Sequence, residues 1–136
     1  MAMDTITIMT PPSYSLSDFQ CHLSKYWQVE SAYGDRIFIQ EDDSRLYLYE
    51  DKNFKNLIKQ EWACSQELRS FFDEAGDANF FLLDYSDLGF VKKVLPVIAD
   101  NHRIVIDNEF GTVMRGNDFV EKLRTNSNWN WREKVN

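Results

Sequence analysis

The sequence has 136 residues, of which 43% are hydrophobic and 15% aromatic, so it is long enough and apolar enough to form one domain with its own core. Its net charge of −7 and pI of about 4.8 argue against direct binding of nucleic acid, because an acidic surface repels phosphates. The longest apolar runs span a few residues, far fewer than the roughly 20 needed to cross a bilayer, so we expect no membrane partner.

Acidic residues are concentrated in residues 1–114, which carry 10 basic and 19 acidic side chains and a net charge of −9. Residues 115–136 have a net charge of +2. An acidic body suits a basic protein partner, because complementary charges speed the encounter of two proteins. Solubility alone explains the same composition, so both interpretations stay open.

The two cysteines and two histidines match neither a metal-binding motif nor a disulfide framework in their spacing. We therefore expect Cys21 and Cys64 to be buried, reduced thiols of a cytoplasmic protein. A Cys–His nucleophile pair that forms only in space, with His22 or His102, is a minor alternative. The first residues have neither the basic nor the apolar segment of a signal peptide. We expect no cofactor and no metal.

The N-terminal segment alternates threonine with apolar side chains over residues 5–10, which fits either a short strand or a loose terminus over residues 1–12. Residues 16–26 then place apolar side chains three and four positions apart, which predicts a helix. Ser15 or Ser17 is positioned to cap its first turn.

Three strand-like segments follow, at residues 28–33, 36–40 and 45–49. The acidic turn at residues 41–44 joins the last two, so the three predict an antiparallel meander. In the last strand the alternation puts Leu46 and Leu48 on one side and Arg45, Tyr47 and Tyr49 on the other. The face with two tyrosines is either a second packing layer or a binding surface.

Residues 51–75 contain neither glycine nor proline and show helical spacing over residues 53–62 and 65–75. Gly76 is a plausible end for the second helix, because glycine readily adopts the left-handed conformation that terminates helices.

A strand–helix–strand–turn–strand–helix unit occupies residues 79–124. It begins with a buried strand at 80–83 and a helix at 86–99, which Ser86 caps. Strands at 103–107 and 112–114 follow around a turn at 108–111, and a helix at 118–123, capped by Asn117 or Asp118, ends the unit. The whole chain, residues 1–136, therefore predicts a single α+β domain in which an antiparallel sheet, a meander plus a hairpin, packs against four to five helices.

Acidic and aromatic residues form the first candidate site, a surface for a protein partner. Tyrosine beside carboxylate suits a protein interface, because aromatic anchors combine there with charge steering. The two tryptophans of the polar tail, residues 126–136, either pack back on the domain, which is favoured, or wait for a partner. The candidate residues are Glu41, Asp42, Asp43, Tyr47, Tyr49, Glu50, Asp51, Trp129 and Trp131.

A second candidate is a small-ligand or catalytic pocket between the sheet and the helices, built from polar residues at the ends of predicted strands. Carboxylates from neighbouring strand ends suit acid–base chemistry, although turn residues of this kind more often bond their own backbone. The candidate residues are Asp84, Asp87, His102, Asp107 and Glu109.

No phosphate loop, nucleophile elbow or paired-cysteine motif is present, so an enzyme is the less favoured class. We expect a small acidic protein-binding module. In length, acidity and lack of a catalytic motif the chain is similar to bacterial immunity proteins, a general likeness of size and charge. That likeness implies an inhibitor that occludes a basic toxin or enzyme. A homodimer held by the tryptophan tail is a further alternative.

Overall fold

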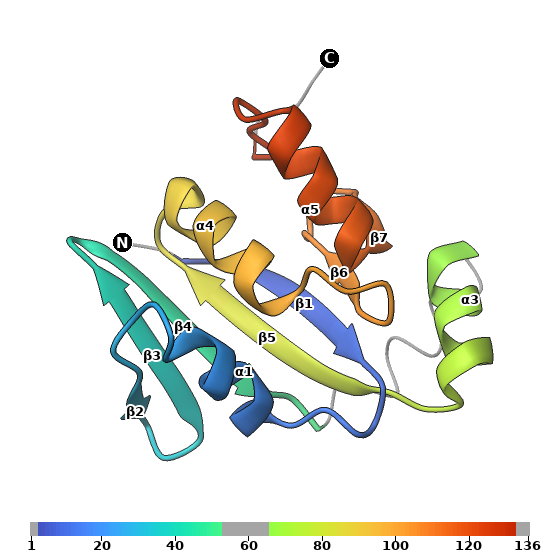
Figure 1. Cartoon of the computed structure of the whole chain (residues 1–136), viewed down its shortest axis with the longest axis horizontal. Coiled ribbons are helices and arrows are strands. Elements are labelled where there is room, and N and C mark those ends of the chain that lie inside the picture. Colours follow the sequence, from blue (N-terminus) through green and yellow to red (C-terminus); the bar gives the residue numbers. More distant parts are fainter. Residues whose placement is uncertain (1–2, 53–65, 133–136) are drawn as a thin grey trace.

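Figure 1 shows the computed structural model, which describes residues 3–52 and 66–132. Seven strands form one antiparallel sheet in the order β2-β3-β4-β5-β1-β6-β7, and helices pack on it, so the predicted α+β class is confirmed. The strands are β1 (Asp4–Thr10), β2 (Glu30–Ala32), β3 (Arg36–Glu41), β4 (Ser44–Glu50), β5 (Asn79–Tyr85), β6 (Val105–Asp107) and β7 (Val113–Arg115). The helices among the described residues are α1 (Leu16–Leu23), α3 (Gln66–Ala75), α4 (Leu88–Ile98) and α5 (Gly116–Thr125).

The first strand lies inside the sheet, between β5 and β6. Ile6 and Ile8 are fully buried, because their alternation with threonine turns both toward the same layer of helices. The strand interpretation of this segment is therefore confirmed, and the loose terminus over residues 1–12 is wrong for residues 4–10.

The two faces of the sheet bury different clusters. Ile8 pairs with Phe81 and Ile106, and these side chains belong to the larger core under α1, α4 and α5. The next residue, Met9, points the other way and packs with Leu68, Phe71 and Phe72 of α3. Figure 1 shows α1 and α4 across the strands and α3 apart from them, at one end of the sheet.

Helix α1 is capped by Ser15 as predicted, with the Ser15 backbone N–H donating to Asp18 Oδ2 at 2.7 Å. It turns Phe19 and Leu23 into the core. Cys21 lies between them in sequence and is therefore exposed, so the predicted burial of this thiol is wrong. Cys64 and the helix predicted over residues 53–62 fall outside the described residues.

The N-cap of helix α4 lies one residue later than predicted. Asp87 is the N-cap, and its Oδ2 accepts from the backbone N–H of Phe90 at 2.9 Å. Ser86 is still held by the sheet, because its backbone N–H donates to the Arg45 carbonyl and its Oγ accepts from the Arg45 N–H. The prediction of Ser86 as the cap is therefore wrong.

Helix α5 follows β7 directly and begins at Gly116, so neither Asn117 nor Asp118 is its cap. The Gly116 N–H donates to the Ile104 carbonyl at 2.7 Å. A Cβ at Gly116 would lie 2.0 Å from the Ala99 carbonyl oxygen, too close for two non-bonded heavy atoms unless the backbone shifts. The close contact between this turn and the end of α4 therefore requires glycine.

Helix α3 is joined to the sheet by a buried arginine of β7. Arg115 is 4% exposed, and its Nη2 lies 3.1 Å from both Glu74 Oε1 and Ser70 Oγ. Its Nη1 donates to the His102 carbonyl, so the buried charge is paired and hydrogen-bonded. Gly76 follows the helix at φ 77°, as the sequence predicted for its end.

The C-terminal tail packs back on the domain. Trp131 is 5% exposed, and its Nε1–H donates to the Tyr85 hydroxyl at 2.9 Å. Its ring meets those of Phe119 and Trp129 at tilted angles, with centroids 5.7 and 5.1 Å away. Arg132 Nε also pairs with Asp4 Oδ2 of β1. The favoured interpretation of the tail is therefore confirmed for Trp131, which belongs to the core.

Candidate functional site

The side of the sheet opposite α1 and α4 has a part that we call the open face. Its members share one face because directly paired residues in a sheet project to the same side. One helix of the described residues, α3, lies on this side, and its apolar side chains pack against Met9, Phe80 and Val105, away from β3 and β4. The open face consists of Thr5, Arg36, Phe38, Tyr47, Tyr49, Leu82 and Asp84.

At the centre of the open face Asp84 joins three strands. Its Oδ1 accepts from Thr5 Oγ1 of β1 at 2.7 Å, and its Oδ2 accepts from the Tyr49 hydroxyl of β4 at 3.3 Å. Nη1 of Arg36, on β3, lies 3.8 Å from the same Oδ2. The carboxylate is 18% exposed, so these contacts compensate a charge that is largely removed from water.

The Arg36 guanidinium also lies over two aromatic rings. Its Cζ is 4.0 Å from the centroid of Tyr49 and 5.8 Å from that of Tyr33. Burial raises the pKa of the Tyr49 hydroxyl, and the negative charge of Asp84 raises it further, while Arg36 opposes the shift. Tyr49 therefore stays a neutral hydrogen-bond donor to Asp84.

The rings next to this group form the aromatic patch, defined as Tyr33, Phe38, Tyr47 and Tyr49. Tyr47 is 4.9 Å from Phe38 and 6.0 Å from Tyr33, measured between ring centroids. Tyr33 is 80% exposed and holds a positive φ of 54° in the turn between β2 and β3. The patch therefore presents rings that are supported by one another and still reach solvent.

Sequence reasoning named the two tyrosines of β4 and missed Tyr33, Arg36, Phe38 and Thr5. The signal was present for β3, because Arg36 and Phe38 alternate with the buried Ile37 and Ile39. Thr5 carried no such signal, since only the pairing of β1 with β5 brings it to Asp84.

The acidic members of the predicted partner surface do not gather around the tyrosines. Glu41 points to the helix side, where Lys93 Nζ lies 2.5 Å from its Oε1 and Trp27 Nε1 donates to its Oε2 at 3.0 Å. The hydrogen bond from Lys93, followed by that from Trp27, lowers the pKa of Glu41. Glu41 is therefore held by α4 on the opposite side of the sheet from Tyr47.

The other predicted carboxylates lie at the two ends of β4. Asp42 and Asp43 are exposed at the tip of the β3–β4 hairpin, where Asp42 has a positive φ of 54°. Glu50 and Asp51 lie at the far end of the same strand, roughly 20 Å away at 3.3 Å per residue. Glu50 pairs with Phe81 and so projects to the helix side, which means that these carboxylates do not form one edge beside the tyrosines.

The alternative pocket is only partly assembled. Glu109 Oε1 accepts from Thr7 Oγ1 at 2.7 Å, and Asp107 Oδ1 accepts from the backbone N–H of Glu109. Both therefore lie near Thr7 of β1, two residues from Thr5, the donor to Asp84. Asp87 instead caps α4, and His102 is exposed in the turn before β6. Across the described ranges 3–52 and 66–132, no three His, Cys, Asp or Glu side chains are arranged to hold a metal ion.

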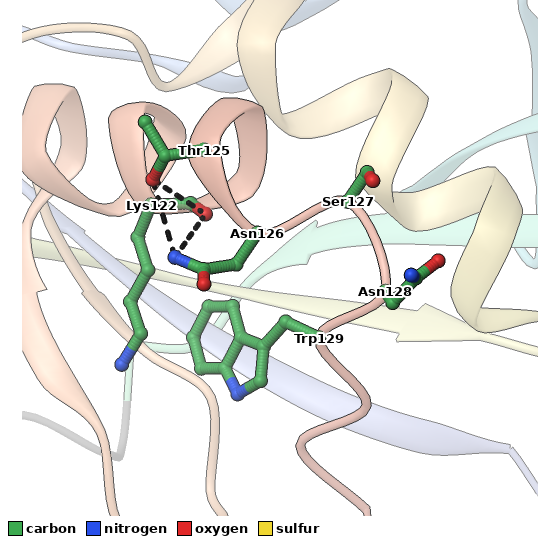
Figure 2. A pocket seen from close by; sticks show the side chains of 6 residues that line it. All are labelled: Lys122, Thr125, Asn126, Ser127, Asn128 and Trp129. Atoms are coloured by element: carbon green, nitrogen blue, oxygen red, sulfur yellow. Dashed lines mark hydrogen bonds between the residues drawn. The ribbon is translucent and has the colours of Figure 1, made fainter.

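Figure 2 shows a pocket at the end of α5. Its volume is about 520 Å³. Asn126 Nδ2 donates to the Lys122 carbonyl and to Thr125 Oγ1, at 3.4 and 3.1 Å. Lys122 Nζ lies 4.3 Å over the ring of Trp129. These side chains satisfy the last turn of the helix, so the pocket has the chemistry of a helix end.

Comparison with protein-family models, with curated proteins and with solved structures found no significant match to this chain. Within residues 3–52 and 66–132, no helix has the length and apolar character needed to cross a bilayer. The geometry of the open face is therefore the basis for a functional assignment.

Proposed function

We propose that this chain is a small protein-binding module that contacts its partner through the open face. The observation that carries the proposal is the aromatic patch, which meets Arg36 on a part of the sheet that the described helices leave uncovered. Tyrosine and arginine are among the residues that contribute most to binding energy at protein interfaces. Because neighbouring side chains already hold these rings, they lose little conformational freedom on binding.

The surrounding charge supports a basic partner. Residues 30–51, which supply the whole aromatic patch, carry seven acidic and two basic side chains and a net charge of −5. Two of the seven, Glu41 and Glu50, project to the helix side of the sheet, so the other five supply the charge near the patch. An acidic rim attracts a basic protein over several ångströms and accelerates its docking, and the attraction weakens as salt is added. The same rim repels the phosphates of nucleic acid.

The most specific form of this proposal is an inhibitor or immunity protein for a basic toxin or enzyme. Such an inhibitor acts by occlusion, because its carboxylates cover the basic residues that the enzyme uses on its own substrate. The module needs no catalytic group for this action, which agrees with its lack of a catalytic motif.

Affinity capture tests the proposed surface. The tagged protein is incubated with an extract of its source cells at low and at high salt, and bound proteins are identified by mass spectrometry. Wild type is compared with Tyr47→Ala on the aromatic patch and with Tyr26→Ala, which removes a 68% exposed tyrosine outside the patch. We expect a stoichiometric basic protein that binds wild type and Tyr26→Ala, leaves as salt rises and fails to bind Tyr47→Ala.

Equal capture by the two tyrosine variants would refute the open face as the contact surface, provided that both melt near the wild-type temperature. Capture of no stoichiometric protein at either salt concentration would refute the module itself.

Association kinetics then test the acidic rim. Neutralising Asp42 and Asp43 to asparagine should slow association with the captured protein and flatten its dependence on salt, because these two carboxylates are exposed beside the face. The matched control neutralises Asp73 and Asp118, which are exposed on α3 and α5. Unchanged rates at low salt in the first variant would show that the hairpin tip does not steer the partner.

A further inference from the structure

A hollow of about 470 Å³ is present beside the open face. It has apolar walls from two rings of the aromatic patch, with charged groups beside them. Its lining residues are Met3, Tyr33, Arg36, Arg45, Tyr47 and Asp84.

The charge of this hollow is opposite to that of its surroundings. Arg36 and Arg45 are the only basic residues of residues 30–51, and both line it. Asp84 is the acidic member of the lining, and its two oxygens already accept from Thr5 and Tyr49. Among the described residues that line the hollow, two arginines therefore face one carboxylate, in a segment whose net charge is −5.

The two arginines have unused hydrogen-bonding capacity. Arg36 Nε is buried and makes no hydrogen bond, although it lies within ion-pair distance, 3.7 Å, of Asp35 Oδ1. Arg45 is exposed, and within the described part of the chain its guanidinium has no hydrogen bond or ion pair. A guanidinium presents donors in a planar fork that matches the two oxygens of a carboxylate.

We infer that this hollow is a carboxylate-binding site that receives one acidic residue of the partner protein, its body against Tyr33 and Tyr47 and its oxygens on Arg36 and Arg45. The inference rests on the proposed protein-binding function and specifies it further. A partner that is basic overall must then place one carboxylate at this position. Such alternation of charge selects one partner and one orientation, because a wrong partner leaves the arginines facing a like charge or no charge.

Small carboxylates test the site without the partner. N-acetylphenylalanine supplies a free terminal carboxylate, N-acetylglutamic acid α-amide supplies a side-chain carboxylate, and N-acetylphenylalanine amide is the neutral control. Each is titrated into the full chain while the arginine Nε–Hε signals are followed by NMR. We expect a saturable shift of the Arg36 and Arg45 signals with at least one carboxylate probe and none with the amide. The probe that saturates at the lower concentration identifies a chain terminus or an acidic side chain as the source.

Matched variants assign any binding to the hollow. Arg45→Gln should weaken the binding of the carboxylate probe about tenfold, the loss of affinity expected when one charge-assisted hydrogen bond is removed. Arg103→Gln, a substitution of an exposed arginine in the turn before β6, should leave it unchanged. Arg45→Gln is at an exposed position, so its folding is not in question, and unchanged probe binding in this variant would overturn the site.

Three other outcomes would also overturn it: equal shifts with the neutral amide, shifts that never saturate, or saturation by inorganic phosphate alone. Each is distinguishable from failure of the proposed function, because capture of a basic protein that depends on Tyr47 would still stand.

Discussion

The hydrogen bond between the tail and the sheet allows a quantitative test of the fold. Trp131 donates to the Tyr85 hydroxyl at 2.9 Å, and both side chains are buried. Tyr85→Phe removes the acceptor and leaves the indole N–H buried without its partner, which should cost about 1–3 kcal/mol of unfolding free energy. Trp131→Phe removes the donor together with part of the ring contact to Phe119, so its cost should be at least as large.

The double variant should lose less than the sum of the two single variants. When both partners are apolar, no buried polar group is left unpaired, so we expect a coupling energy of about 1–2 kcal/mol. The assay is urea unfolding of the four proteins followed by far-UV circular dichroism, with the slope of free energy against urea compared among them. Additive losses, within about 0.5 kcal/mol, would refute the reasoning and show that the tail does not make this bond in solution.

Three further predictions concern the helices and the tyrosines. Gly116→Ala should lower the free energy of unfolding by about 1–3 kcal/mol, because the added Cβ has no room against the end of α4. The control is Gly89→Ala, whose added Cβ would meet only a side-chain oxygen, at 3.1 Å. It should lower the free energy of unfolding by less in the same urea assay. Asp87→Ala should cost about 1 kcal/mol by loss of the α4 cap, and an unchanged urea midpoint would contradict that role. Burial raises the folded-state pKa of Tyr85 and Tyr49 above the ordinary value of 10. The stability that they contribute is therefore complete below pH 10 and should decline as the pH rises above it, as measured by thermal melting. An equal decline in the Tyr85→Phe variant would argue against the contribution of Tyr85.

Local patterns predicted the elements whose cause is local. The alternation of leucine and tyrosine in residues 45–49 correctly placed Leu46 in the core and Tyr47 on the opposite face, because strand geometry alone decides this. Gly76 ended α3 as expected, since its left-handed conformation depends on its own backbone.

Features that depend on distant segments were beyond that reasoning. The start of α5 is decided by how closely Gly116 approaches Ala99, and a cap pattern in sequence carries no information about that contact. The partners of Asp84 come from β1, β3 and β4, so the pairing of the strands had to be known before Thr5 and Arg36 could be assigned to the site. Glu41 is in an acidic turn, yet a lysine of α4 holds it on the other side of the sheet.

The position of β1 has a consequence for how the chain acquires its structure during synthesis. Residues 4–10 are made before both of their neighbours in the sheet, residues 79–85 and 105–107. The β2–β4 segment can pair locally as soon as it is made, whereas β1 must wait for about 70 to 100 further residues. Contacts between residues so far apart in sequence are slow to form. β1 should therefore join the sheet late, and until then its apolar side chains are exposed to aggregation.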